Sequence, residues 1–462
     1  VHPLRVPDVA GIEQLARSDA AVLFAERAAN AEPGFAFEEH VDAVFEICHR
    51  LDGLPLALEL AAGRLRVFSA EEVAGRLDDQ LATLRSKQRT GDLRHATIEA
   101  TIAWSWGLLD DLERTLLRRL SVFRATWAME AAEAICGHDP INQDQIADLV
   151  ARLVGKSLVV VNGVSAGSTR YRVLEPIRQY AARRLDDQAT AEMRGRCIDY
   201  WSAVMAGAND PSARITLRDY EHANTLGADR ANLTAAIEWA LASQRYEDAI
   251  VIFASPFGEL LMMRGSSFDL ASRVMDTALE HRETVSHQVL IWAIEIMCVI
   301  ASTDSRNQAW LHYATCGREI SQSSEERQWF ELTAAFATNR LGRHDAAAAM
   351  IDRIVADADA PGIRASALLG KTEYVAPQQS WELCEAALEL SPIDALGWWD
   401  EGVAAWLVCI AAVDTGRYDV AIRMGERSVG RCRRIGWSMM EWHSAALLAR
   451  IYVMVGRLED AR

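Results

Sequence analysis

Apolar side chains recur every three or four residues along most of the chain, which is the period of an α-helix with one buried face. This pattern predicts a helix from Asp19 to about Asn30, with Ser18 as its N-terminal cap, and a second helix from Glu38 to Leu51. Gly53 stands where a helix C-terminus favours a positive φ, and Pro55 suits the first turn of a third helix. Residues 1–90 are therefore expected to form a helical domain.

Between residues 91 and 190 the apolar pattern changes from helical to alternating and back. The alternating part predicts two strands around a Gly/Ser loop, with the first strand ending at Asn162-Gly163. The expected elements are helices over 94–109, 111–123 and 144–153, strands over 158–161 and 169–174, and a helix over 176–185. Three helices followed by a β-hairpin are the outline of a winged-helix domain.

Residues 191–462 show only helical patterns, and one short phrase recurs among them. Its four copies are Gln244–Ala249, Gly342–Ala347, Gly416–Ala421 and Gly456–Ala461. Their arginines are 98, 74 and 40 residues apart, and the last two spacings suit units of ~37–40 residues. We interpret the phrase as the turn of a tetratricopeptide-like helical hairpin, in which glycine turns the chain, an acidic residue caps the second helix and alanine permits close packing. Four unrelated helix starts are the alternative. The expected fold class is mostly α: a helical domain and a winged helix, followed by an α-solenoid.

Charge and composition narrow the possible functions. The net charge is −17, divided as −5 over residues 1–90, −1 over 91–190 and −11 over 191–462, so no segment is a basic block that would wrap nucleic acid. The eight cysteines are scattered without a Cys-x-x-Cys pair, which indicates reduced, buried thiols. The start resembles no signal peptide and no apolar run reaches ~18 residues, so we expect a cytoplasmic protein without membrane contact.

Three short motifs resemble catalytic or phosphate-binding signatures but lack the required context. Gly163–Gly167 has the spacing of a serine-hydrolase elbow, yet a strand is predicted to follow it where that motif needs a helix. Gly155-Lys156-Ser157 and Gly370-Lys371-Thr372 lack the glycine that a phosphate loop carries five residues earlier. No metal-spaced cluster stands out. We therefore expect no catalytic residues, no metal site and no enzyme activity in this chain.

One segment carries a more specific resemblance. Leu51-Asp52-Gly53-Leu54-Pro55-Leu56 is similar to the Gly-Leu-Pro-Leu motif of STAND ATPases, the signal-transduction NTPases that include AfsR-like and LuxR-type bacterial transcriptional regulators. The segments that continue this resemblance, in the family's order, are Thr101–Leu109, Leu120–Phe123, Leu153–Val159 and Arg170–Ala181. The resemblance covers about residues 1–190, and the repeats agree with the family's sensor half.

The resemblance assigns roles to a few residues. In the family, the proline of this motif packs on the adenine, which implies nucleotide contact by Pro55 with its neighbours Gly53 and Leu54; a plain helix-start proline is the equal alternative. Many relatives hold the ADP phosphate with a histidine of the winged helix, and Leu174 occupies that position here. Leucine cannot donate to a phosphate, so Glu175 and Arg178 are expected instead to form an interdomain polar contact that acts as a switch.

The family's phosphate loop and magnesium-binding aspartate lie upstream of this motif, and only ~50 residues precede it here. The chain is thus expected to be the C-terminal portion of a longer regulator, or a gene remnant, and to bind ATP or ADP only if an upstream nucleotide-binding segment is present. The resemblance implies a regulatory and sensor role. The repeats would bind a small-molecule inducer or a protein, and the winged helix would couple that event to the ATPase core. DNA would be contacted only through a helix-turn-helix not present here. The alternatives are a stand-alone interaction scaffold and a DNA-binding winged-helix protein.

Overall fold

The computed structural model describes residues 4–7, 10–51, 53–85, 93–165, 167–208, 227–254, 268–303, 305–393, 401–435 and 438–461. Its helices and strands divide into two compact units, Val1–Tyr200 and Trp201–Arg462. The first unit contains both the helical and the winged-helix regions expected from the sequence, and the second contains the repeats. The boundaries at residues 90 and 190 stay predictions.

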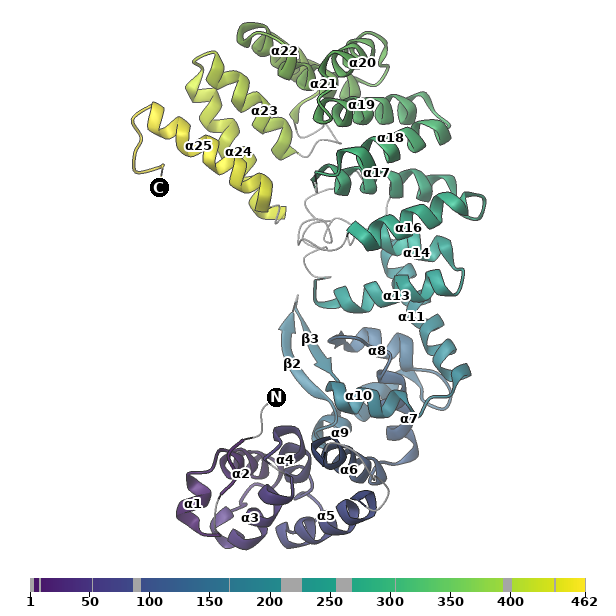
Figure 1. Ribbon diagram of the computed structural model, residues 1–462, viewed down its shortest axis with the longest axis vertical. Helices are drawn as coiled ribbons and strands as arrows, with labels where there is room; N and C mark the ends of the chain where they lie inside the picture. The colour runs from purple at the N-terminus through teal and green to yellow at the C-terminus, as the bar shows by residue number, and fades with distance from the viewer. Residues whose placement is uncertain are drawn as a thin grey trace. The chain divides into compact units, whose positions relative to one another are not determined.

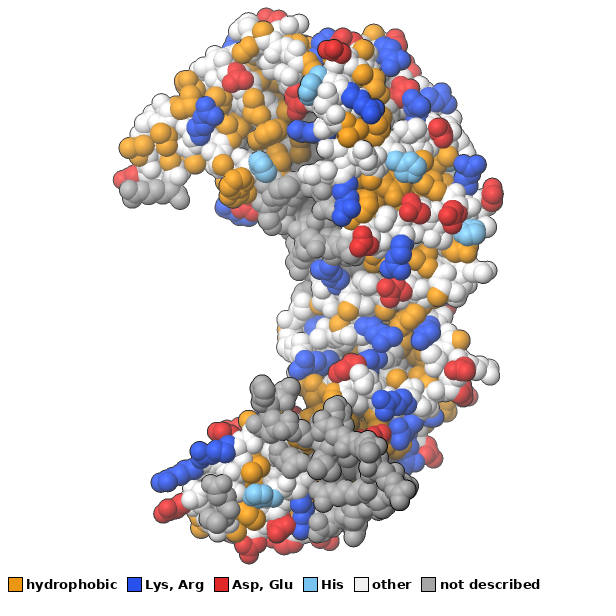
Figure 2. Space-filling model, in the orientation of Figure 1, with side chains coloured by type: hydrophobic (Ala, Val, Ile, Leu, Met, Phe, Trp, Pro, Cys, Tyr) orange, Lys and Arg blue, Asp and Glu red, His pale blue; other side chains and the backbone are white. Residues whose placement is uncertain are grey.

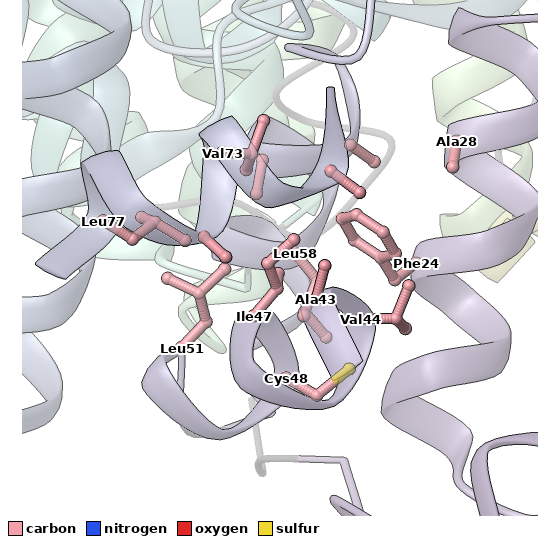
Figure 3. Packing of buried hydrophobic residues seen from close by; sticks show 14 of the residues in the cluster. Phe24, Ala28, Ala43, Val44, Ile47, Cys48, Leu51, Leu58, Val73 and Leu77 are labelled. Atoms are coloured by element: carbon pink, nitrogen blue, oxygen red, sulfur yellow. The ribbon is translucent and has the colours of Figure 1, made fainter. Parts of the chain in front are cut away.

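The first unit begins with short helices packed around one apolar core. These are α1 (Ile12–Ala16), α2 (Asp19–Ala31), α3 (Val41–Arg50), α4 (Pro55–Ala62), α5 (Ala70–Arg85) and α6 (Leu93–Gly107). The oxygen of Ser18 accepts a hydrogen bond from the N–H of Ala21, so the predicted cap is confirmed. The second predicted helix starts later than expected, because residues 37–39 form a separate 3₁₀ turn. Figure 3 shows Phe24, Ile47 and Leu58 meeting in the core.

The winged helix follows as α7 (Asp111–Leu120), β1 (Trp127–Ala128), α8 (Met129–Cys136), α9 (Ile146–Gly155), β2 (Val160–Ser165), β3 (Ser168–Arg172) and α10 (Glu175–Ala182). Its strands form an antiparallel sheet in the order β1-β3-β2, in which Tyr171 lies opposite both Trp127 and Val161. The predicted hairpin is confirmed, but its first strand does not end at Asn162-Gly163: an irregularity between Val161 and Val164 lets pairing resume up to Ser165. The short elements β1 and α8 were not predicted from the sequence.

Arg119 joins two helices of the winged helix. It lies in the last turn of α7 and is almost fully buried. Its guanidinium donates to the carbonyl oxygens of Cys136, His138 and Asp139, at 2.8, 2.7 and 2.6 Å. These carbonyls lie at and just beyond the end of α8, where helix carbonyls lack partners within their own helix. The buried guanidinium of Arg119 therefore supplies hydrogen bonds to the carbonyls at the end of α8 and holds this end against α7.

The second unit is built from consecutive helices that pack against their sequence neighbours (Figure 1). The helix α11 (Asp187–Ala208) runs into it from the first unit. Its further helices are α13 (Arg230–Ala242), α14 (Tyr246–Phe253), α16 (Phe268–Glu280), α17 (His287–Thr303), α18 (Asn307–Ile320), α19 (Ser324–Arg340), α20 (His344–Asp357), α21 (Pro361–Lys371), α22 (Pro377–Leu390), α23 (Glu401–Asp414), α24 (Tyr418–Ile435) and α25 (Ser438–Met454). The starts of α17, α19 and α21 are 37 residues apart.

Each copy of the recurring phrase forms the turn that the sequence predicted. Residues 244, 342, 416 and 456 have positive φ, and the N–H of the arginine after each bonds the carbonyl oxygen five residues earlier. A fifth turn of this kind occurs at Ser305-Arg306, where serine replaces glycine. It divides the 98-residue spacing into 61 and 37, which explains why that spacing fitted less well. The predicted capping role of the acidic residue is wrong at the first two copies: α14 and α20 have no side-chain hydrogen bond at their caps, and Glu247 of the first copy instead accepts the N–H of Ser286.

The turn arginines also connect successive hairpins. Arg306 lies over the ring of Phe268 in α16, at 4.3 Å, and Arg417 lies over the ring of Trp381 in α22, at 4.6 Å. In both cases the ring belongs to the helix just before the one that leads into the turn, α16 before α17 and α22 before α23. On the face shown in Figure 2, acidic and basic side chains are interspersed over the middle of the repeats. No helix in the described residues is both long and apolar enough to cross a membrane.

Candidate functional site

The helix before the wing is the element that enters the major groove in DNA-reading winged helices. Here that helix is α9, whose exposed positions include Asp148 and Arg152, with Asp144 just before its start. Arg152 forms ion pairs with Asp110 and Glu113 of α7 and its cap. The exposed surface of α9 and the turn before it therefore offers two carboxylates and one cation that already has two acidic partners.

The first strand of the wing carries no charged residue and exposes two valines. In β2, Val161 and Val164 are 49% and 72% exposed, and neither Lys nor Arg occurs between residues 160 and 165. On β3, Arg170 is buried and donates to the backbone carbonyl of Thr126, whereas Arg172 is exposed. The strand order leaves β2 at the edge of the sheet. This surface differs in charge from a strand that tracks a phosphate backbone.

A buried carboxylate connects the start of α7 to the end of α9. Glu113 has no exposed surface, and its side chain accepts the N–H of Asp110 while Asp110 accepts the N–H of Glu113, at 2.9 and 2.8 Å. This is a capping box. Both carboxylate oxygens of Glu113 also accept from Nζ of Lys156, at 2.6 Å. Hydrogen bonding by the Glu113 N–H, followed by Arg152, lowers the pKa of Asp110.

This arrangement gives Lys156 of the Gly-Lys-Ser tripeptide a structural role. The Asp110-x-x-Glu113 spacing could have predicted the capping box from the sequence, although not its contact with a lysine 43 residues later. In the second tripeptide, Nζ of Lys371 lies 2.5 Å from a carboxylate oxygen of Asp352. Ser165 of the third motif lies in the antiparallel hairpin. Across the residues that the structure describes, no cluster of His, Cys, Asp and Glu could hold a metal ion.

The three residues assigned to the nucleotide by resemblance form the turn into α4. Gly53 has φ of +61°, and its carbonyl oxygen accepts the N–H of Leu4 at 2.8 Å. A Cβ at Gly53 would lie 2.2 Å from the carbonyl oxygen of Leu4, so the close approach requires glycine. Leu54 is buried, and Pro55 occupies the first position of α4. Asp52 lies outside the described residues. The turn is as predicted, and its nucleotide contact stays a prediction.

The two residues assigned to an interdomain switch pair with each other. Arg178 donates through Nε and Nη2 to the two carboxylate oxygens of Glu175, both at 2.7 Å, and through Nη1 to the carbonyl of Ser121 at 3.2 Å. The Arg178 hydrogen bonds are the main reason that the pKa of Glu175 falls from 4.5 to about 2. These bonds tie α10 to the residue after α7 within the winged helix. An additional contact with another domain stays a prediction.

Residues 109–186 match the family model of the winged helix-turn-helix domain. Over 276 residues, 59% of this chain, the sequence is 36% identical to a Mycobacterium bovis protein whose name assigns it to the HTH-type transcriptional regulators. An uncharacterized protein of Mycobacterium tuberculosis is 36% identical over 177 residues, 38% of this chain. The chain spans 31% of the length of the first relative and 45% of the second.

A solved structure with a broader but weaker likeness is a Signal Transduction ATPase with Numerous Domains from Pyrococcus horikoshii, which has a tetratricopeptide repeat sensor. It is 15% identical, with a TM-score of 0.44, over 96% of this chain and 58% of that one. A likeness at this level carries no inference about the present chain. The predicted winged helix is thus confirmed, whereas the STAND, AfsR-like or LuxR-type assignment stays a prediction.

Proposed function

We propose that this chain is the regulatory portion of a transcriptional regulator, in which the winged helix is a packing and coupling module. The helical repeats would bind an inducer or a protein partner, and the winged helix would transmit that event to an ATPase core in the cytoplasm. The winged helix-turn-helix match and the regulator-like relative support a regulatory role. We further propose that the chain itself performs no catalysis.

The charge on α9 is the observation that carries this proposal. A recognition helix faces phosphates on both sides of the groove, and Lys and Arg supply most of the binding free energy. Asp148 on α9 and Asp144 just before it would repel those phosphates, and Arg152 would have to leave Asp110 and Glu113 to reach them. A helix with these charges is better suited to protein contacts than to DNA.

A gel-shift or filter-binding assay at physiological salt tests this assignment. We expect no sequence-specific complex and no steep dependence of affinity on salt concentration. Two variants are compared with the unmodified chain. Asp148→Ala removes a carboxylate that would repel DNA, and Arg172→Ala removes an exposed cation of the wing. Tight, salt-sensitive binding by the unmodified chain, weakened by Arg172→Ala, would instead support the DNA-binding alternative.

The nucleotide proposal has its own test. Phosphate-binding amides, a lysine and a metal provide most of the grip on a nucleotide, and one proline ring is a small contact. We therefore propose that this chain alone binds ATP no more tightly than the millimolar range. Calorimetry with magnesium measures this directly, and micromolar binding would overturn it. If an added upstream segment restores binding, Pro55→Ala should weaken it.

A further inference from the structure

His138, in the turn after α8, lies against α11 of the same unit. Its side chain is 15% exposed, and its Nε2 atom lies 3.4 Å from Oε1 of Glu192, near the start of α11. Its other ring nitrogen, Nδ1, is buried and has no hydrogen-bond partner among the residues that the structure describes. One nitrogen of the ring thus meets a carboxylate, and the other is enclosed.

Two arginines flank this contact. Nη1 of Arg119 donates to the backbone carbonyl oxygen of His138 at 2.7 Å. Nε of Arg196, one turn further along α11, donates to the same Oε1 of Glu192 at 3.3 Å. Glu192 therefore has a permanent cation as its partner, whatever the charge of His138.

The remaining titratable groups beside this contact are the carboxylate of Asp139, which follows His138, and the thiols of Cys136 on α8 and Cys197 on α11. Burial raises the pKa of Cys136 to about 12 and also raises the pKa of Cys197, so both thiols are uncharged at neutral pH. Glu192 and Asp139 are thus the groups that attract a charged ring.

A second proton on His138 would occupy an unfavourable position. Because Nε2 lies beside a carboxylate oxygen, the neutral ring carries its proton there, and an added proton must go to Nδ1. The new N–H would be buried without an acceptor, and the charged ring would lie beside two arginines. Burial, followed by Arg119 and Arg196, lowers the pKa of His138 below its ordinary 6.5, although Glu192 and Asp139 act against the change.

We propose that the packing of His138 on α11 is pH-sensitive: it is stable while the imidazole is neutral and weakens when the ring takes up a proton. In the unfolded chain this imidazole protonates near pH 6.5, and in the folded chain only at lower pH. A fall in pH below 6.5 therefore favours local unfolding at this contact, whereas above that value the contribution is constant. Because α11 continues into the second unit, the proton acts on the helix that links the two units along the chain. This inference does not rest on the proposed function.

Urea midpoints of the full chain at about pH 7.5 and about pH 5.5 test this dependence. The midpoints are read by hydrogen–deuterium exchange of peptides from α8 and α11. We expect the midpoint to fall towards the lower pH and His138→Gln to reduce that fall, because glutamine is polar but takes up no proton in this range. His443→Gln, which removes an exposed histidine of α25, is the matched control and should show the full fall. An equal fall in His138→Gln would overturn the proposal.

Titration of the imidazole by nuclear magnetic resonance separates electrostatic control from simple packing. The His138 signal is assigned by its loss in His138→Gln. Arg196→Met should raise the midpoint of this titration, because Glu192 then attracts the ring without a competing cation, and Glu192→Gln should lower it. A midpoint at or above 6.5 in the unmodified chain, or one that neither variant shifts, would overturn the proposal.

Discussion

At the scale of single residues, Gly53 offers the sharpest test of local geometry. Gly53→Ala introduces a side chain at positive φ and 2.2 Å from the carbonyl oxygen of Leu4. Gly163→Ala is the matched control, because Gly163 also has positive φ but an added Cβ would meet nothing within 4 Å. We expect the control to cost about 1 kcal/mol of unfolding free energy and Gly53→Ala to cost more. Equal costs in urea denaturation would show that the Leu4 contact contributes nothing.

Glu175 gives a pH-dependent prediction. Its pKa falls from 4.5 to about 2 on folding, mainly through the Arg178 hydrogen bonds. A lowered folded-state pKa adds stability above about pH 4.5, and that stability is lost as the pH falls towards 2. The carboxylate is 57% exposed, so solvent screening limits the gain to less than about 1 kcal/mol. Urea midpoints of the unmodified chain should fall more steeply over this range than those of Glu175→Gln. Parallel curves would exclude the pair as a source of stability.

Residue-scale roles were only partly predictable from the sequence. The cap at Ser18 and the positive φ at Gly53 follow from neighbours along the chain, so they could be predicted. The contact of Glu113 with Lys156 and the role of Arg119 could not, because those partners are brought near only in the folded winged helix. The pairing of Glu175 with Arg178 is local, and the sequence could suggest it; whether either residue also touches another domain cannot be derived from spacing.

At the scale of helices, the close packing of the first turn of α24 against α23 can be tested by introducing a larger side chain. Ala421 is fully buried, and its carbonyl oxygen accepts a bond from the thiol of Cys409 in α23. Ala421→Leu should therefore cost about 1–3 kcal/mol of unfolding free energy. Glu247→Ala, at an exposed position in the first copy of the phrase, is the control and should cost much less. Similar losses in urea denaturation would contradict the assigned register of the repeats.

Element positions were predicted best where apolar periodicity is long, as in α2 and the repeat helices. The two-residue strand β1 is too short for a periodic signal, and only its pairing with β3 reveals it. The fifth repeat turn was missed because serine at 305 replaces the glycine of three other copies, and tryptophan at 310 replaces the alanine that all four have. Its backbone hydrogen bond is nevertheless the same, since the geometry depends on φ rather than on one residue type.

At the scale of the whole molecule, the division into two units predicts separable stability. Arg119→Met leaves the carbonyls of Cys136, His138 and Asp139 without their donor and should cost about 2–4 kcal/mol. Hydrogen exchange should then rise in α7 and α8, with α19–α24 of the second unit unchanged. Arg118→Met, one position earlier, is the control for the loss of a charge from α7. Increased exchange in both units would show that they unfold together.

The equal 37-residue intervals between the starts of α17, α19 and α21 also limit how the number of repeats can change during evolution. Excising residues 324–360 would remove one hairpin and bring α21 into the place of α19, with the same kind of face turned towards α18. Excising a single helix would present the wrong face to its neighbour, and excising α22 would also leave Arg417 without the ring of Trp381. Gene duplication and loss can therefore lengthen or shorten this surface only in whole hairpins, so the area offered to a partner would evolve in discrete steps.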